Sequence, residues 1–289
     1  MPTPLKEKIG VSHLRAARSG GPKMAMLTCY DFLTARLMQE AGVPSLLVGD
    51  SAANVVLGHE STLPVSLEFM IDITAAVRRG APLALLVADM PFGSYQASVA
   101  QGVKNVAGMI KRTNCDMVKI EAGKGQLKLV EKLADAGVAV MAHLGLRPQS
   151  VGILGGYKFQ GRTAAEATEI VALALQMERR GAAAILLEAV PPEVTNAVIE
   201  VTSVPVIGCG AGPGCHGCVV VTQDALGLTS NKPKFVPRLA EMASPLREAF
   251  ASYVKDVSCG AYPAAQHNYA MSGEEMTKFR AMLDQRRGV

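Results

Sequence analysis

The amino-acid sequence predicts an α/β fold, and within that class a single-domain (β/α)8 TIM barrel over residues 1–289, with an N-terminal helix and a C-terminal helical extension. Three observations predict it. Apolar runs of strand length alternate with amphipathic stretches of helical length, joined by short connections. Eight such runs fit a closed barrel better than a doubly wound open sheet. An open sheet that binds dinucleotides would also need a Gly-rich turn after the first strand, where this chain has Cys29-Tyr30-Asp31.

The predicted strands are runs rich in Val, Ile, Leu, Met and Ala, as expected of parallel strands buried on both faces. They lie at residues 23–29, 45–51, 83–89, 116–121, 138–144, 183–188, 205–209 and 218–222. Helices are predicted at residues 5–19, 31–41, 66–79, 96–113, 125–136, 163–180 and 192–201, and over most of the chain past residue 237. Ser66 and Thr163 are typical N-caps, and Pro192 lies in a first turn. The strict alternation of these strands and helices implies right-handed βαβ units.

Composition excludes several classes of protein. The chain is 49% hydrophobic and 19% charged, as globular chains are, with only 4% aromatic residues. Its net charge of +4 comes from scattered basic pairs, so we expect no nucleic-acid partner. No apolar run is long enough to cross a bilayer and the N-terminus lacks a signal core, so we expect no membrane association and a cytoplasmic location. The six Cys are too scattered for a disulfide framework and are expected to be reduced.

Carboxylates end four of the predicted strands: Asp50, Asp89, Glu121 and Glu188. The active sites of barrels of this class lie at the C-terminal ends of the strands, so all four should meet at one mouth. Each alone could simply cap the following helix. Together they would repel one another unless a cation neutralises them, and carboxylate oxygens are the ligands that Mg²⁺ prefers. The pattern therefore predicts a divalent metal site.

Two further side chains are expected at this mouth. Lys119 lies two residues before Glu121, so both point to the same face of the strand. A Lys inside an apolar strand is costly to bury without an anion, which favours contact with a substrate carboxylate over a Lys reaching solvent. His143 ends the fifth strand. It is either a core histidine with satisfied hydrogen bonds or a donor to charge that develops during a reaction, and the sequence leaves both open.

The segment from Gly208 to Cys218 invites two other hypotheses. Its Gly-rich part, residues 208–214, follows the seventh strand, where barrels often bind phosphate, but it could equally be a tight turn. Cys215-His216-Gly217-Cys218 resembles half of a zinc site. We do not favour zinc, because no second Cys pair has the spacing of a closed site and Cys218 is expected to open a strand.

The chain resembles the 3-methyl-2-oxobutanoate hydroxymethyltransferase family, also called ketopantoate hydroxymethyltransferases, over roughly residues 5–260. The matching motifs are Leu27-Thr28-Cys29-Tyr30-Asp31, Val48-Gly49-Asp50-Ser51, Val55-Val56-Leu57-Gly58-His59, Ala88-Asp89-Met90-Pro91-Phe92, Val118-Lys119-Ile120-Glu121, His143-Leu144-Gly145-Leu146, Leu154-Gly155-Gly156-Tyr157-Lys158, Leu187-Glu188, Gly210-Ala211-Gly212-Pro213 and Pro233-Lys234-Phe235-Val236.

The resemblance implies a (β/α)8 barrel that assembles into a homo-oligomer, commonly a decamer. It implies transfer of a one-carbon unit from 5,10-methylenetetrahydrofolate to 3-methyl-2-oxobutanoate, giving 2-dehydropantoate for pantothenate and coenzyme A synthesis. By resemblance, one Mg²⁺ per subunit is held by Asp50, Asp89 and Glu121. The keto acid is bound by Asp50, Ser51, Asp89 and Lys119, to which we add His143, and Glu188 is the catalytic proton acceptor.

Three segments depart from the family pattern. After the second strand the usual Asp-Ser-Leu-Gly-Met is replaced by residues 50–54, Asp-Ser-Ala-Ala-Asn. The usual Cys-Asp-Gly-Gln is replaced by residues 215–218, and Leu-His-Asp by residues 222–224, Thr-Gln-Asp. His216 thus replaces an acid of the family pattern. We expect this position to act at the mouth of the barrel, in folate contact, loop order or subunit packing.

Two other functions stay open on the sequence. One is a C–C lyase of the metal-dependent keto-acid type, which needs a nucleophilic Cys loop or a phosphate site; Cys115 and Cys209 are poorly placed for that role. The other is a non-catalytic paralogue that keeps the barrel and binds a keto acid. The Gly-rich loop keeps the lyase open, whereas the intact set of charged residues at the strand ends argues against a non-catalytic paralogue.

Overall fold

A computed structural model describes residues 3–230 and 232–287. By its internal contacts the chain divides into two compact units, residues 1–240 and 241–289, which are described separately. The first unit holds the barrel and the second holds the C-terminal helical extension, so the predicted fold class is confirmed. That residues 1–289 form one domain stays a prediction.

The first unit is built on eight parallel strands that close in the order β1 to β8. Their bounds are β1 Met24–Thr28, β2 Ser45–Val48, β3 Leu85–Asp89, β4 Met117–Glu121, β5 Val140–Gly145, β6 Ala184–Glu188, β7 Val206–Cys209 and β8 Gly217–Val220. β8 pairs with β1 from Met24↔Gly217 to Leu27↔Val220, and this pairing closes the ring. All eight strands coincide with predicted ones.

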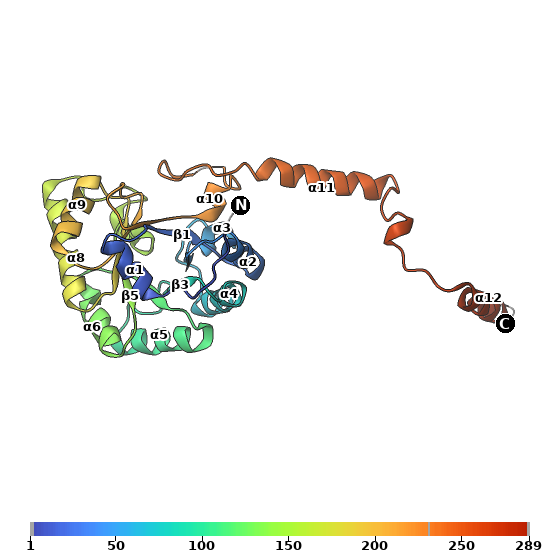
Figure 1. Cartoon of the computed structure of the whole chain (residues 1–289), viewed down its shortest axis with the longest axis horizontal. Helices are drawn as coiled ribbons and strands as arrows, with labels where there is room; N and C mark the ends of the chain where they lie inside the picture. Colours follow the sequence, from blue (N-terminus) through green and yellow to red (C-terminus); the bar gives the residue numbers. More distant parts are fainter. Residues whose placement is uncertain (1–2, 231, 288–289) are drawn as a thin grey trace. The chain divides into compact units, whose positions relative to one another are not determined.

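Helices surround the strands in Figure 1. The longer ones in this unit are α1 Val11–Arg18, α2 Phe32–Glu40, α4 Leu67–Gly80, α5 Val99–Thr113, α6 Leu127–Asp135, α8 Ala164–Arg179 and α9 Pro192–Val201. The short ones are α3 Ala52–Val55, α7 Val151–Leu154 and α10 Thr222–Ala225, with 3-10 turns η1 Lys124–Gln126 and η2 Pro148–Ser150. Ser66 and Thr163 cap α4 and α8 as predicted, accepting hydrogen bonds from the backbone N–H of Phe69 and Glu166 at 3.2 Å each.

Two element bounds differ from the prediction for physical reasons. The first helix begins at Val11, because the residues before it run extended and pair with other loops, as Ile9 N does with Leu83 O at 2.7 Å. The eighth strand ends at Val220, because Thr222 turns back to β1. Its N–H donates to the Thr28 hydroxyl at 2.9 Å and its own hydroxyl donates to the Thr28 carbonyl.

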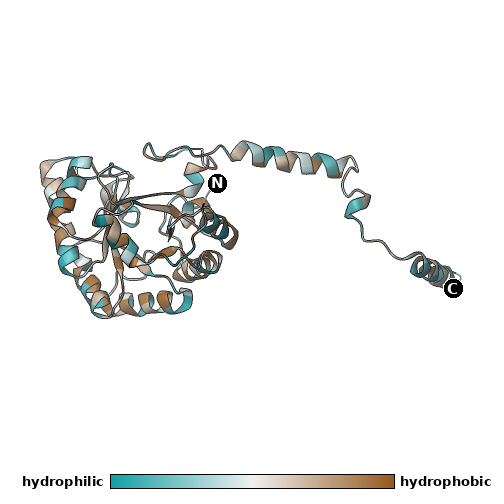
Figure 2. Cartoon of the chain, viewed as in Figure 1, coloured by the Kyte–Doolittle hydropathy of each residue, from teal (hydrophilic) through white to brown (hydrophobic). Residues whose placement is uncertain are grey.

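Side chains that alternate along the strands divide between two cores. An inner core fills the barrel and includes Met26, Leu47, Val87, Met141 and Leu186, all nearly inaccessible. Leu14 of α1 belongs to this inner core, so α1 closes the barrel at the N-terminal ends of the strands. An outer core joins the opposite strand faces to the helices, which carry both hydrophobic and hydrophilic residues (Figure 2). Sequence alternation thus determines both layers.

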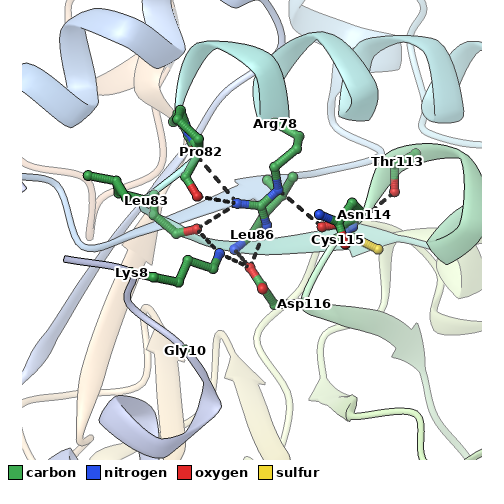
Figure 3. Close-up of polar contacts among 12 residues, drawn as sticks. Lys8, Gly10, Arg78, Pro82, Leu83, Leu86, Thr113, Asn114, Cys115 and Asp116 are labelled. Atoms are coloured by element: carbon green, nitrogen blue, oxygen red, sulfur yellow. Dashed lines mark hydrogen bonds and ion pairs between the residues drawn. The ribbon is translucent and has the colours of Figure 1, made fainter.

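A polar cluster at the N-terminal ends of β3 and β4 fixes the segment that precedes α1 (Figure 3). Asp116 accepts from Lys8 Nζ at 2.8 Å, from the backbone N–H of Leu86 at 2.7 Å, and from Arg78. Arg78 also donates to the carbonyls of Pro82 and Ala84. Residues at this end of a TIM barrel serve stability rather than chemistry.

The second unit consists of α11 Ala243–Ser258, the turn η3 Ala265–His267 and α12 Gly273–Arg287. The ring of Tyr262 packs at a tilt against those of Tyr253 and His267, at centroid distances of 5.6 and 5.0 Å. Among the described residues of either unit, no helix is both long enough and apolar enough to span a bilayer.

Candidate active site

One cavity of about 220 Å³ opens at the C-terminal ends of the strands, and most of the predicted site residues line it. They are Asp50, Ser51, Asp89, Lys119, His143 and Glu188, contributed by β2 to β6. Glu121 differs, because its side chain lines a neighbouring cavity together with Tyr95 and Gln149. Parallel strands that end in polar residues therefore bring together side chains spread over 139 positions of sequence, from residue 50 to residue 188.

Asp50, Asp89 and Lys119 form a buried charged group. Oδ2 of Asp89 accepts from the backbone N–H of Asp50 at 2.9 Å and lies 3.0 Å from Nζ of Lys119. Burial raises the pKa of Asp89 to about 7, opposed by Lys119 and reinforced by Asp50. Burial alone would lower the pKa of Lys119, but Asp89, Asp50 and Glu121 together raise it above its ordinary value. Lys119 therefore stays charged, with acids of the protein around it, and its predicted contact with a substrate carboxylate stays a prediction.

His143 links Lys119 to Glu188. Its Nδ1 lies 3.2 Å from Nζ of Lys119, and its Nε2 lies 3.2 Å from Oε2 of Glu188. Burial and the Lys119 charge hold the pKa of His143 well below its usual range, so the ring is neutral. Since an ammonium only donates, Nδ1 must be the acceptor and the ring proton must be on Nε2. This proton faces Glu188, although the angle falls short of a hydrogen bond.

Within the described residues no cation contacts Glu188 directly, and its neighbour is the neutral ring of His143. Burial raises its pKa to about 7, opposed by the charge of Lys119. Its side chain keeps 20% of its surface exposed to the cavity, which leaves room for the carboxylate to turn. A carboxylate with a pKa near neutrality is suited to taking a proton.

Glu121 and Asp50 meet through Gln149, a residue that the sequence did not single out. The backbone N–H of Gln149 donates to both oxygens of Glu121, at 2.9 and 3.1 Å, and its Nε2 donates to Oδ2 of Asp50 at 2.8 Å. Burial and Asp50 raise the pKa of Glu121 to about 8, against the opposing effect of Lys119. Gln149 lies in η2, in a segment without apolar periodicity, so nothing in the local pattern marked it.

Ser51 is positioned by two neighbours. Its Oγ lies 2.8 Å from the hydroxyl of Tyr30, which follows β1. A Cβ at position 49 would lie 2.8 Å from the same Oγ, so the site requires Gly49. Tyr30 was also not singled out from the sequence, although it lies within the motif that follows the first strand.

The residues present fit a divalent cation at the Asp50–Asp89 pair. Oδ1 of Asp89 is buried and has no hydrogen-bond partner, and burial, reinforced by the charge of Asp50, raises the pKa of both Asp89 and Glu121. Both observations, with an all-oxygen donor set, suit a hard cation such as Mg²⁺. Within the described residues, no three Asp, Glu, His or Cys side chains lie close enough together to hold a metal. The set Asp50, Asp89 and Glu121 therefore stays a prediction.

One of the departures near β8, His216, lies away from the cavity, whereas Asp224 in the segment after β8 lines it. His216 precedes β8 at the N-terminal end of the barrel, where its Nδ1 accepts from the backbone N–H of Val206 at 2.9 Å. The expectation that it acts at the mouth is therefore wrong, because the chain returns from β7 to β8 through residues 210–216 without a helix. In that loop, Gly210 and Gly212 have positive φ and pack against Phe235 and Pro192, as a tight turn requires.

Comparison with known proteins identifies the family of the chain. The family model described as ketopantoate hydroxymethyltransferase matches residues 8–265. The 3-methyl-2-oxobutanoate hydroxymethyltransferase of Thermobifida fusca is 46% identical over 263 residues, covering 91% of this chain and 94% of that protein. The enzyme of the same name from Desulfotalea psychrophila is 43% identical over 258 residues, covering 89% and 92%.

Solved structures share the fold at much lower identity. Phosphonopyruvate hydrolase superposes with a TM-score of 0.59 at 13% identity, covering 96% of each chain. For 2,3-dimethylmalate lyase the TM-score is 0.55 at 15% identity, again covering 96% of each. This likeness shows the barrel alone and gives no support to the lyase alternative. The match along most of the sequence shows instead that this chain belongs to the ketopantoate hydroxymethyltransferase family, the enzymes that transfer a hydroxymethyl group to 3-methyl-2-oxobutanoate.

Proposed function

We propose that this enzyme takes its one-carbon unit from 5,10-methylenetetrahydrofolate and adds it to C3 of 3-methyl-2-oxobutanoate, giving 2-dehydropantoate, with Glu188 as proton acceptor and Mg²⁺ as cofactor. The observation that carries the proposal is the position of Glu188. It is a partly buried carboxylate with a pKa of about 7 that faces the same small cavity as Asp50, Asp89 and Lys119. A base and an anion-binding group that line one cavity suit proton removal from a keto acid.

The keto acid is held by charge and hydrogen bonds. Lys119 offers its ammonium to the substrate carboxylate while it stays paired with Asp89. Ser51, held by Tyr30, offers its hydroxyl beside Asp50. Asp50 and Asp89 would hold the divalent ion, which when bound acts as a Lewis acid that polarises the keto group and acidifies the neighbouring C–H.

Glu188 then takes the C3 proton. The Nε2 proton of His143 faces Oε2 of Glu188, so His143 orients the carboxylate; the keto-acid contact predicted for His143 stays a proposal. Water adds to the methylene carbon of the folate, and as the bonds to N5 and N10 break its two protons go to those nitrogens, which releases formaldehyde and tetrahydrofolate. The carbon nucleophile left by proton removal then bonds to the formaldehyde carbon, and the formaldehyde oxygen takes the proton held by Glu188 to become the hydroxyl of the product. The small cavity excludes bulk water from the proton-transfer step while leaving its mouth open to the second substrate.

Proton exchange tests the first half of this proposal without the folate. The protein is incubated with 3-methyl-2-oxobutanoate and Mg²⁺ in D₂O, and loss of the C3 proton signal is followed by NMR. We expect exchange that requires Mg²⁺ and disappears in Glu188→Gln. Absence of exchange in folded wild-type protein would refute Glu188 as the base. Addition of 5,10-methylenetetrahydrofolate then tests transfer; exchange without product would refute the folate step alone.

We also propose that the chain forms a homo-oligomer, with a decamer as the expected size. Apolar side chains of α11 that are 39–65% exposed support self-association: Leu246, Phe250, Tyr253, Val254 and Val257. Analytical ultracentrifugation at micromolar concentration measures the assembly directly. A single monomeric species would contradict the proposal. The predicted cytoplasmic location stays a prediction.

A further inference from the structure

Gln149 occupies the position between two of the buried acids and is hydrogen bonded on every side. Its Nε2 donates to Oδ2 of Asp50 at 2.8 Å and to the Met90 carbonyl at 3.0 Å. Its Oε1 accepts from the Tyr95 hydroxyl at 2.8 Å and from Nε2 of Gln96 at 3.1 Å. The side chain is only 8% exposed. Such a saturated amide inside an acidic cluster is too constrained to be a chance loop contact.

The partners fix which way the amide points. If it were reversed, its oxygen would face the Asp50 carboxylate and the Met90 carbonyl, two acceptors, and its nitrogen would face the donors Tyr95 and Gln96. Tyr95 is itself held, because its hydroxyl also lies 3.3 Å from the Glu121 carbonyl. The donor end of Gln149 is therefore locked toward Asp50.

Because the Gln149 amide is a neutral donor, it stabilises the acids without competing with a cation for them. Lys119 stabilises Asp89 with a full positive charge, which competes with any cation for the same acid. Gln149 stabilises Asp50 and Glu121 with hydrogen bonds that add no net charge, so the attraction of these acids for a cation is retained. By holding Oδ2 of Asp50, it leaves Oδ1 for a cation shared with the unpartnered Oδ1 of Asp89.

We propose that Gln149 is a positioning residue for the divalent cation: it holds Asp50 and Glu121 in place so that cation binding requires little rearrangement of the carboxylates. The inference rests on the proposed function, because it assumes that Asp50 and Asp89 bind a cation. It goes further in assigning a role to the loop after β5, which supplies no predicted ligand. Residues that support metal ligands in this way typically affect affinity by roughly 10- to 100-fold when replaced.

The test measures cation binding in the full-length protein without substrate. Mn²⁺ is titrated into wild type and Gln149→Met, a variant of similar length without hydrogen bonds, and free Mn²⁺ is followed by EPR. We expect Kd to rise by roughly tenfold or more, with turnover recovering at saturating Mg²⁺. Gln160→Leu is the matched control on the same loop. Its Kd should stay within about twofold of wild type, because the side chain of Gln160 donates to the Lys158 carbonyl of its own segment and the substitution keeps the backbone hydrogen bond to Ala189.

Tyr95→Phe provides a second variant should Gln149→Met fail to fold. It removes one hydrogen bond to Oε1 of Gln149 and leaves the amide in place, so we expect a smaller rise in Kd, of about threefold. An unchanged Kd in a folded Gln149→Met, or in Tyr95→Phe when only that variant folds, would overturn the positioning role. If wild type fails to bind Mn²⁺, the cation of the proposed function fails first and the positioning role fails with it.

Discussion

Nε2 of His143 on β5 lies 3.2 Å from Oε2 of Glu188 on β6, and Nδ1 of the same ring lies 3.2 Å from Nζ of Lys119 on β4. The ring thus connects the cation proposed to bind the keto acid to the carboxylate proposed to take its proton. Lys119 sets the tautomer of His143 and so directs the Nε2 proton toward Glu188. Lys119 does this from β4, a strand that does not contact Glu188 itself.

His143→Asn should separate these two contacts. Asn keeps a carbonyl acceptor for Lys119 near the Nδ1 position but has no group that reaches Glu188. The 3.2 Å separation of Nε2 and Oε2 becomes a charge-assisted hydrogen bond when the Glu188 carboxylate turns into line during proton transfer. Such a bond contributes about 1.5 kcal/mol, so we expect kcat for C3 proton exchange to fall roughly tenfold with KM for the keto acid nearly unchanged. His143→Ala should lower kcat and raise KM together. A change in KM alone for His143→Asn would contradict an orienting role.

The pH dependence of exchange should follow Glu188. The base must be ionised, and burial raises the pKa of Glu188 to about 7. With saturating Mg²⁺, kcat/KM should be constant above pH 8 and fall with unit slope below about pH 7, reaching about one tenth of the plateau at pH 6. His143 contributes no limb, because its pKa is held well below its usual range. A rate that stays constant down to pH 5 would exclude Glu188 as the titrating base.

Stability without divalent cations should decrease as the pH rises. Burial raises the folded-state pKa of Asp89 and Glu188 to about 7 and that of Glu121 to about 8. Between about pH 4 and pH 8 the folded protein then binds more protons than the unfolded chain, so the free energy of unfolding falls as pH rises, by up to about 1.4 kcal/mol per pH unit for each group.

Urea titrations in EDTA at pH 5, 6, 7 and 8 measure this slope. Asp89→Asn should reduce it, because Asn has no proton to lose. Asp135→Asn is the control at an exposed carboxylate and should leave the slope unchanged. A free energy of unfolding that increases from pH 5 to pH 8 in EDTA would contradict the raised pKa values.

The sequence predicted the parts of the site that depend on strand ends. Asp50, Asp89, Lys119 and Glu188 follow or end apolar runs, and closure of parallel strands is enough to bring them together. It did not predict what lies between them. Gln149 reaches Asp50 across 99 positions of sequence, from a loop whose path is determined by packing and not by a repeating pattern.

The final directions of the side chains could likewise not be predicted from the sequence. A period of two places Lys119 and Glu121 on the same face, yet Glu121 turns toward Gln149 and the neighbouring cavity. His143 was left with two alternatives, and the structure assigns it contacts with Lys119 and Glu188. Strand position determines which face a side chain leaves from, whereas its final direction depends on partners from other elements.

The cluster around Asp116 gives a prediction about stability alone. Asp116 accepts hydrogen bonds from Lys8, Arg78 and the backbone of Leu86 at the closed end of the barrel, and its side chain is only 20% exposed (Figure 3). Asp116→Asn keeps the shape and removes the charge that pairs with both cations. We expect a loss of about 2 kcal/mol in the free energy of unfolding, read from the urea midpoint, because charge-assisted hydrogen bonds are among the stronger ones.

The same variant should keep the wild-type kcat and KM, because the catalytic cavity lies at the opposite ends of the strands. Asp135→Asn serves as the control here too, with an expected change within about 0.5 kcal/mol. Lys8→Met should reproduce only part of the Asp116→Asn effect, since its side chain is 43% exposed and Arg78 would still neutralise Asp116. If Asp116→Asn lowers kcat while stability is unchanged, the cluster has a role in the reaction that its position in the barrel does not explain.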